Sequence, residues 1–550
     1  MRAVQLSPTG AFAVCAALCC IAVLAPGCSS RITPAQQGII DRVLLIGNQV
    51  EPQDLDPQII TGVQEYHIVS ALFEGLVSED PTDLHPLAGA AKSWTIADDG
   101  LTYTFILQKN GRWSNGDPVR ASDFVFSFKR ILSPRLGSEY AYMLFCLKNA
   151  EAFNKDSITD FNRVGARALD DTTLVLTLAR PTPYFLSLIA HSAWYPVHPA
   201  TILAFGAIDE RGSAWTKPEN MVCNGPFLLN KWVLNTVIEA KKNPYYWDRS
   251  TVRLNAIRFY PIENNQTEQR AFATGQLHIT TSVPVAKIQW YQTHQPAVLR
   301  IDPYLATYFY LVNIERPPFN DVRVRRALSM AIDRQGIVDH VVKGGQMPAT
   351  CFTPPHTAGY TAKPHITFDT AEARRLLTEA GYGPGGKPFP PFSLLYNTSE
   401  SHHTLAQAVQ EMWKKYLHIE VTLKNQEWKV YLASTHSRDY DIARMGWTGD
   451  YNDPMTFLDM WVTGGGNNRV GFSQPLYDSL LAAAAREADS AARYGLLRRA
   501  EALLLDCLPI IPVYFYTNPF LIHGAVKQWL PNILNHHPYK FVYLKNASVN

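Results

Sequence analysis

Residues Ala443–Leu458 read Ala-Arg-Met-Gly-Trp-Thr-Gly-Asp-Tyr-Asn-Asp-Pro-Met-Thr-Phe-Leu and combine a cation, a run of small residues and an anion. Arg444 and Asp450 are six positions apart, a separation of roughly 20 Å in an extended chain. Gly446 and Gly449 leave room for another backbone to approach closely. A short zwitterionic peptide carries opposite charges at a similar separation. The stretch could therefore pair with the backbone of an extended peptide, while its own two charges pair with the charged ends of the peptide. The alternative is a core strand whose two charges form surface salt bridges.

Length and composition limit the remaining possibilities. The chain has 550 residues, too many for one core, so two or three domains are expected. It is 47% hydrophobic and 18% charged, the balance of an ordinary globular protein. The net charge is +2 and like charges do not form runs, which argues against nucleic acid as a partner. The 12 Trp, 26 Tyr and 25 Phe can line a large ligand site, although a large core uses them too.

The N-terminus has the pattern of an export signal. The apolar run Ala11–Leu24 is too short for a transmembrane helix and is followed by small residues. Small residues before Cys28 are typical of a lipoprotein cleavage site, and a lipid on Cys28 would tether the mature protein to a membrane. Ala25 stands where leucine is usual, and Pro26 is an unusual neighbour of the cleavage site. We therefore expect residues 1–28 to be a signal peptide, with Cys28 as a candidate for lipidation.

Strand and helix patterns alternate along the rest of the chain, which predicts α/β layers. Turn signals such as Asp99-Gly100 and Asn115-Gly116 separate several of the predicted elements. No repeat of 20 to 50 residues is present. Strands are predicted over 43–49, 102–107, 278–281, 308–313, 392–396 and 510–516, and helices over 370–381, 404–417 and 492–505.

One further helix is predicted after Asn320-Asp321, which can cap it. Its buried face follows a helical period through Val324, Ala327, Leu328, Ala331 and Ile332. Its solvated face is expected to carry Arg323, Arg325, Arg326 and Asp333.

Cysteine and histidine spacing does not predict a metal site. The cysteines beyond the signal have no zinc spacing, and we interpret them as buried free thiols, with a disulfide as the alternative; they are Cys146, Cys223, Cys351 and Cys507. His402-His403 is interpreted as solvent-exposed or as a helix cap, and His536-His537 as surface.

Motifs of common enzymes are absent from the sequence. It lacks Gly-x-Ser-x-Gly, His-Glu-x-x-His and a phosphate loop. A carboxylate pair of the glycosidase type remains an alternative, with candidates Asp439, Asp441, Asp450 and Asp453. We predict a protein that is not an enzyme and that needs no cofactor or metal.

Several blocks together resemble the peptide/nickel class of periplasmic solute-binding proteins. They are Trp94…Asp99-Gly100…Tyr103-Thr-Phe, Trp113-Ser-Asn-Gly-Asp-Pro-Val, Asn224-Gly225…Asn243-Pro244…Tyr246-Trp247-Asp248 and Val324-Arg-Arg-Ala-Leu-Ser-Met-Ala-Ile-Asp333. The likeness is closer to the oligopeptide-binding branch, which serves bacterial ABC importers. Tyr396-Asn-Thr-Ser399, Asn425-Gln-Glu-Trp-Lys429 and Gly446-Trp447…Asp450-Tyr-Asn452 carry that narrower match.

The resemblance implies a fold of two lobes joined by a hinge, with an extra inserted α/β domain and an extended peptide enclosed between the lobes. It implies a monomer in the periplasm or cell envelope that delivers short peptides to membrane permease subunits. The corresponding expected domains are lobe I over 29–73, 196–305 and 520–550, the inserted domain over 74–195, and lobe II over 306–519.

The resemblance also implies roles for individual residues. Asp450 matches the carboxylate that holds the ligand's α-amino group, and Arg444 and His402 match groups that meet ligand carboxylates. Two segments match the edges that pair with the ligand backbone, and two aromatic residues match walls of side-chain pockets. The edges are Gly446, Trp447 and Thr448 with Gly62 and Val63, and the walls are Trp428 and Trp447.

Two departures from the family pattern are visible. Thr435 occupies the place of a second arginine, and Arg438 could replace that arginine only if its loop bends. Ala306 and Thr448 stand at both positions of the family member's disulfide. Since related proteins take nickel complexes or haem, a receptor for a nickel chelate or haem is the alternative function.

Overall fold

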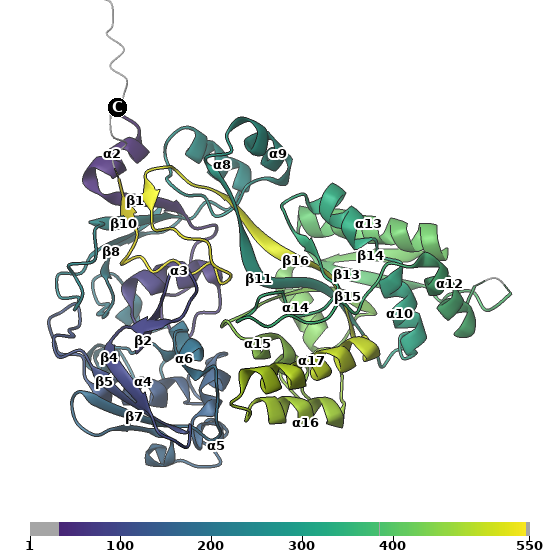
Figure 1. Cartoon of the computed structure of the whole chain (residues 1–550). Coiled ribbons are helices and arrows are strands. Elements are labelled where there is room, and N and C mark those ends of the chain that lie inside the picture. The colour runs from purple at the N-terminus through teal and green to yellow at the C-terminus, as the bar shows by residue number, and fades with distance from the viewer. Residues whose placement is uncertain (1–31, 384, 546–550) are drawn as a thin grey trace, which may run out of the picture.

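The computed structural model of the protein describes residues 32–383 and 385–545. The predicted signal peptide and Cys28 lie outside these residues. Within them, no helix is both long and apolar enough to cross a membrane. Helices and strands form two lobes connected by the long strands β11 and β16 (Figure 1), which confirms the predicted α/β, two-lobed architecture.

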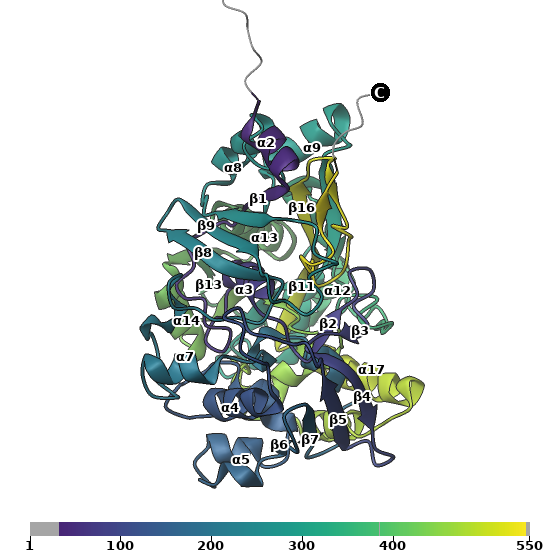
Figure 2. The same ribbon diagram turned by 90° about the vertical axis from the view of Figure 1, so that its left-hand side faces the viewer.

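The first lobe is built on a four-stranded sheet in the order β1-β10-β9-β8, in which β1 is parallel to β10 and the other pairs are antiparallel. Figures 1 and 2 place α2, α8 and α9 at one end of this lobe. The predicted strand over 278–281 is reduced to bridges of Ile279 with Ile46 and Ile522. The bounds are α2 Pro34–Asp41, β1 Val43–Gly47, α3 Val63–Leu72, β8 Phe227–Val233, β9 Val237–Lys242, β10 Ala256–Tyr260, α8 Asn265–Ala273 and α9 Val285–His294.

The inserted domain has its own antiparallel sheet, in the order β4-β5-β7-β6, and lies at the opposite end of the molecule from α2 (Figures 1 and 2). Buried Arg130 from α4 forms an ion pair of 2.5 Å with buried Asp56 of the first lobe. Its guanidinium also donates to Gln58 at 2.8 Å, so this contact fixes the domain to the segment that leads into α3. The bounds are β4 Ala91–Ile96, β5 Thr102–Leu107, α4 Ala121–Ile131, α5 Ala150–Asn154, β6 Ala166–Ala168, β7 Thr173–Thr177 and α6 Phe185–Leu188, and α7 Pro199–Ala204 follows this domain in the chain.

The second lobe contains a six-stranded mixed sheet in the order β12-β16-β11-β15-β13-β14. Apolar positions of its strands and helices form a common buried core that includes Trp413, whose indole donates to the carbonyl of Leu328 at 2.9 Å. The bounds are β11 Leu299–Val312, α10 Val322–Met330, β12 Met347–Pro348, α12 Thr370–Glu379, β13 Phe392–Asn397, α13 Glu400–Leu417, β14 Val421–Gln426, α14 Trp428–His436, β15 Ile442–Thr448, α15 Met455–Leu458, α16 Pro475–Ala484, α17 Ser490–Cys507 and β16 Ile510–Leu521.

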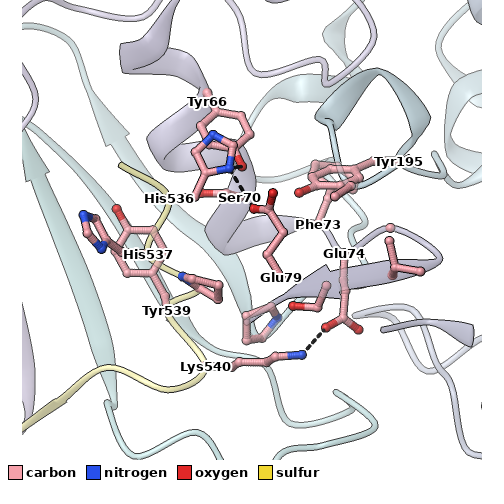
Figure 3. A pocket seen from close by; sticks show the side chains of 16 residues that line it. Tyr66, Ser70, Phe73, Glu74, Glu79, Tyr195, His536, His537, Tyr539 and Lys540 are labelled. Carbon is pink, nitrogen blue, oxygen red and sulfur yellow. Dashed lines mark hydrogen bonds and ion pairs between the residues drawn. The ribbon is translucent and has the colours of Figure 1, made fainter. Parts of the chain in front are cut away.

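Two expectations about surface residues are wrong. Arg325 is buried, not solvated, because its guanidinium donates to the carbonyls of Cys507 at 3.0 Å and Phe319 at 2.6 Å. His536 and His537 are not on the surface either: His536 Nδ1 lies 2.7 Å from Glu79 Oε2 (Figure 3), and the His537 ring stacks on Trp529. In each case one of the partners, Cys507 or Glu79, comes from a distant part of the chain.

The Asn-Gly and Tyr-Trp motifs of the sequence surround one buried carboxylate, that of Glu74. It accepts hydrogen bonds of 2.6 Å from the Tyr246 hydroxyl and the Trp247 indole. It also pairs with Lys540 at 3.0 Å (Figure 3). Asn224 bonds both backbone groups of Glu74, at 3.1 and 2.7 Å. The two motifs and Lys540 therefore bind the segment that follows α3 to the rest of the first lobe through the backbone and the fully hydrogen-bonded carboxylate of Glu74.

We predict that Lys540→Met lowers the free energy of unfolding, because it leaves the buried Glu74 carboxylate without its cation. Breaking one partner of a buried ion pair costs about 3–5 kcal/mol. Urea denaturation followed by tryptophan fluorescence measures the loss. Lys287→Met, at an exposed position on α9, is the matched control and is expected to leave the transition unchanged.

Candidate functional site

The candidate site is organised around β15, which has a strand partner on one side over its whole length and on the other side only at its start. β11 pairs with it from Ala306↔Thr448 to Val312↔Ile442. On the opposite edge β13 pairs only with Ile442 and Ala443. In the described part of the chain, Gly446, Trp447 and Thr448 therefore have no strand on that edge. Such an edge can accept an extended peptide as an added strand.

Gly446 keeps the backbone of β15 accessible. A Cβ atom at this position would lie 3.2 Å from both the Arg444 guanidinium and the Tyr516 hydroxyl. Any larger residue would therefore crowd the Arg444 and Tyr516 side chains beside the free edge.

Arg444, at the start of the free edge, is a half-buried cation whose recorded partners are neutral. Its guanidinium donates to Tyr516 Oη at 2.9 Å and to Asn397 Oδ1 at 3.3 Å, and lies 5.0 Å from the centre of the Tyr308 ring. Its Nε is buried without a hydrogen-bond partner among the described residues. Because an anion does not compensate this charge, the site can receive a carboxylate.

His402, in the first turn of α13, lies near the same Tyr308 side chain as Arg444, with its ring 5.7 Å from the Tyr308 ring. Burial, together with the positive charge of Arg444, lowers the pKa of His402 to about 3. The imidazole is therefore neutral at pH 7, so it can offer a ligand a hydrogen bond but not a charge. Its neighbour His403 contacts Tyr396 Oη at 2.6 Å, so the two imidazoles have different surroundings.

Asp450, just beyond β15, is the anion at the other end. Its two carboxylate oxygens accept hydrogen bonds of 3.2 Å from Tyr140 and Tyr142, which belong to the range of the inserted domain. Burial raises the pKa of Asp450 to about 6, while the hydrogen bonds of the two tyrosines oppose this rise. The half-buried carboxylate thus has hydrogen-bond donors but no ion-pair partner among the described residues.

A neighbouring ion pair holds the turn that carries Asp450. Arg493 of α17 donates two hydrogen bonds of 2.7 Å to the buried carboxylate of Asp453. Thr456 of the same turn accepts hydrogen bonds from the Asp450 backbone at 3.1 Å and, at its carbonyl, from the Trp447 indole at 2.7 Å. The position of Asp450 relative to β15 is therefore set by several mutually supporting bonds.

Gly62 and Val63 begin α3 in the first lobe, and Val63 is 43% exposed. A Cβ at Gly62 would lie 2.0 Å from Glu65 Oε2, so a larger residue there would displace the Glu65 side chain. Trp428 is 49% exposed at the start of α14 and stacks on Tyr431, whose hydroxyl donates to the Arg444 carbonyl. Exposed apolar side chains thus lie on both lobes.

The other candidate carboxylates have structural partners. Asp439 and Asp441 pair with Arg316 at 3.1 and 3.3 Å, and Asp453 pairs with Arg493. The geometry thus does not support a glycosidase-type pair between one of these three and Asp450.

The sequence did not point to several residues that complete the site. Tyr140, Tyr142, Tyr308 and Tyr516 come from three separate segments, and their local sequence has no pattern that distinguishes them from core tyrosines. Asn397 lies in the block Tyr396-Asn-Thr-Ser399, which resembles the oligopeptide-binding branch. This resemblance was the only indication in the sequence that Asn397, which contacts Arg444, belongs to the site.

Comparisons with known proteins identify the family of the chain. Residues 85–469 match the family model described as bacterial extracellular solute-binding proteins, family 5. The chain belongs to this family. It is 37% identical to the periplasmic oligopeptide-binding protein OppA of Salmonella typhimurium over 539 residues, 96% of each chain.

Two solved structures of the family have the same architecture. The murein tripeptide binding protein MppA of Escherichia coli is 36% identical, with a TM-score of 0.81 over 91% of this chain and 98% of the other. OppA of Haemophilus influenzae in complex with the peptide RPPGFSPFR is 33% identical, with a TM-score of 0.80 over 92% of this chain and 99% of the other.

We predict that replacing both tyrosines, Tyr140→Phe and Tyr142→Phe, raises the pKa of Asp450 above its present value of about 6. Hydrogen bonds to a carboxylate favour its charged form, and losing them is expected to shift the pKa by about one unit. Carbon-13 NMR of labelled aspartate carboxyls measures the titration. Tyr245→Phe, at an exposed position, is the control and should leave it unchanged.

Proposed function

We propose that this protein is an extracytoplasmic receptor that encloses short peptides between its lobes and delivers them to the permease subunits of an ABC importer. The observation that carries the proposal is the free edge of β15, which has Arg444 at one end and Asp450 just beyond the other. An extended peptide would pair with the edge through its backbone, whatever its side chains, and ion pairs would fix its ends.

The relatives support a peptide ligand. OppA is named for oligopeptides and MppA for a murein tripeptide, and the solved structure of Haemophilus influenzae OppA contains a bound peptide. They do not favour a nickel chelate or haem. Solute-binding proteins of this kind are receptors, and we accordingly infer that the protein binds its ligand without converting it.

We assign the roles at the site as follows. Asp450 holds the peptide's α-ammonium group, and Arg444 with His402 meets its carboxylate. Gly446 to Thr448 and Gly62-Val63 pair with the peptide backbone from the two lobes, while Trp428 and Trp447 form walls of side-chain pockets. We also assign the three domains to the ranges predicted from the sequence. Closure of lobe II on lobe I would then bury the ligand.

We also infer a periplasmic location, as for the OppA relative. The segment that contains Cys28 would tether the mature protein to a membrane if this cysteine is lipidated. Mass spectrometry of the mature N-terminus tests this point, since a diacylated Cys28 adds the mass of its lipid and a cleaved but unmodified N-terminus contradicts the anchor.

Asp450→Asn is the direct test of the amine site. It keeps the shape of the side chain but removes the charge, so we expect the affinity for a free-amine tripeptide to fall at least about tenfold, the size of one charge-assisted hydrogen bond. Isothermal titration calorimetry measures it. The N-acetylated tripeptide should bind both proteins equally, and equal binding of the free-amine peptide to both would remove Asp450 from the site.

A pH dependence follows from the same carboxylate. Burial raises the pKa of Asp450 to about 6, so it is mostly ionised at pH 7 and mostly protonated at pH 5. Protonation removes the charge that pairs with the ammonium group, and the affinity for a free-amine peptide should fall about tenfold between these two pH values. An N-acetylated peptide should show a flat profile, and a flat profile for both peptides would contradict the prediction.

A further inference from the structure

Tyr184 belongs to the range of the inserted domain, but its ring packs on the second lobe. It directly precedes α6, on the side of the domain that faces α15 and α17 (Figure 1). Its ring stacks on that of Tyr451, with 5.2 Å between the ring centres and an angle of 5° between the planes. The guanidinium of Arg493 lies 5.3 Å from the centre of the same Tyr184 ring. One aromatic side chain therefore makes two contacts across the boundary between these parts of the molecule.

Both partners of Tyr184 are held in place by buried contacts of the second lobe. Tyr451 is 5% exposed and directly follows Asp450 in the chain. Arg493 donates two hydrogen bonds of 2.7 Å to the carboxylate of Asp453. A guanidinium that is fixed in this way can offer its face to an aromatic ring and keep its ion pair. The two partners thus form a preorganised surface beside the turn that carries Asp450.

The contact of Tyr184 differs from the other contacts at this boundary. Tyr140 and Tyr142 donate to the Asp450 carboxylate, which the proposed function assigns to the ligand's ammonium group. The strength of those two hydrogen bonds therefore depends on the charge of Asp450 and on the group that binds there. The stack of Tyr184 on Tyr451 consists of two neutral rings and includes none of the residues assigned to the ligand. Its strength is therefore independent of the charged ends of a peptide.

We propose that Tyr184 is a positioning residue that stabilises the closed arrangement of the inserted domain and the second lobe, and thereby raises the affinity for every bound peptide by one common factor. The inference rests on the proposed function and adds to it a contribution to affinity that does not come from ligand contacts. A peptide has to enter before the lobes close, so the contact acts after entry and slows release. A ring stack and a cation–π contact of this kind correspond to a factor of about three to ten.

The test replaces Tyr184 by leucine, which keeps an apolar side chain but removes the stack and the cation–π contact. Stopped-flow displacement measures the association and dissociation rates, and calorimetry measures the affinity and the stoichiometry. The probes are trialanine, its N-acetylated form, and the tripeptides in which Lys or Phe replaces the first alanine. Tyr184→Leu is expected to raise the dissociation rate of every probe by the same factor, about three to ten, and to leave the association rate and the stoichiometry unchanged.

Further variants identify the partners of the ring. Tyr184→Phe keeps both ring contacts and should retain the wild-type dissociation rate. Tyr184→Leu/Tyr451→Leu should raise this rate by less than the product of the two single effects, because both single variants remove the same stack. Leu169→Ala, at an exposed position in the range of the inserted domain, is the matched control and should leave all rates unchanged.

An unchanged dissociation rate in Tyr184→Leu overturns the inference. A loss that is confined to one kind of first side chain also overturns it, because Tyr184 would then line a ligand pocket instead of acting through closure. A lower stoichiometry at unchanged rates contradicts it as well, since this result indicates partial unfolding. If wild type binds none of the probes, the proposed function fails first, and this inference falls with it.

Discussion

Two opposite charges, Arg444 and Asp450, are held apart at the two ends of one free strand edge, and neither has an ionic partner among the described residues. Because β15 is extended, the two side chains cannot neutralise each other. Each is instead stabilised by neutral groups, tyrosine hydroxyls and an asparagine amide, which satisfy hydrogen bonds without removing the charge. A ligand that carries both charges at the matching separation can form ion pairs with Arg444 and Asp450 at the same time.

Several other buried charges of the protein are instead held in ion pairs. Arg130 pairs with Asp56, Arg493 with Asp453, and Lys540 with Glu74, each at 3.0 Å or less. These pairs join segments that are distant in the chain and hold the inserted domain, the turn after β15 and the C-terminal segment in place. Since a buried pair is costly to break on one side, they fix geometry. Arg444 and Asp450 differ from these pairs in that each is bonded by neutral groups beside a free strand edge.

The contact of Tyr140 and Tyr142 with Asp450 connects two parts of the molecule. The tyrosines belong to the range of the inserted domain, and Asp450 follows a strand of the second lobe. A ligand ammonium bound at Asp450 would lie within this contact, so that ligand binding and the approach of the two parts would stabilise each other. Lobe closure of this kind is the signal by which such receptors present their cargo.

The sequence alone determined the class of the protein, the alternation of strands and helices, and the charges and small residues of β15, because these depend on local periodicity and on motifs of contiguous residues. Tertiary structure decided which polar residues are partners. Arg325 sits in a polar helix pattern yet is buried against carbonyls, and His536 and His537 are enclosed by Glu79 and Trp529. The hydrogen bonds of Tyr140 and Tyr142 to Asp450 likewise join residues far apart in the chain. Hydrogen bonds across such separations leave no period or spacing in the sequence, so only the folded chain could reveal them.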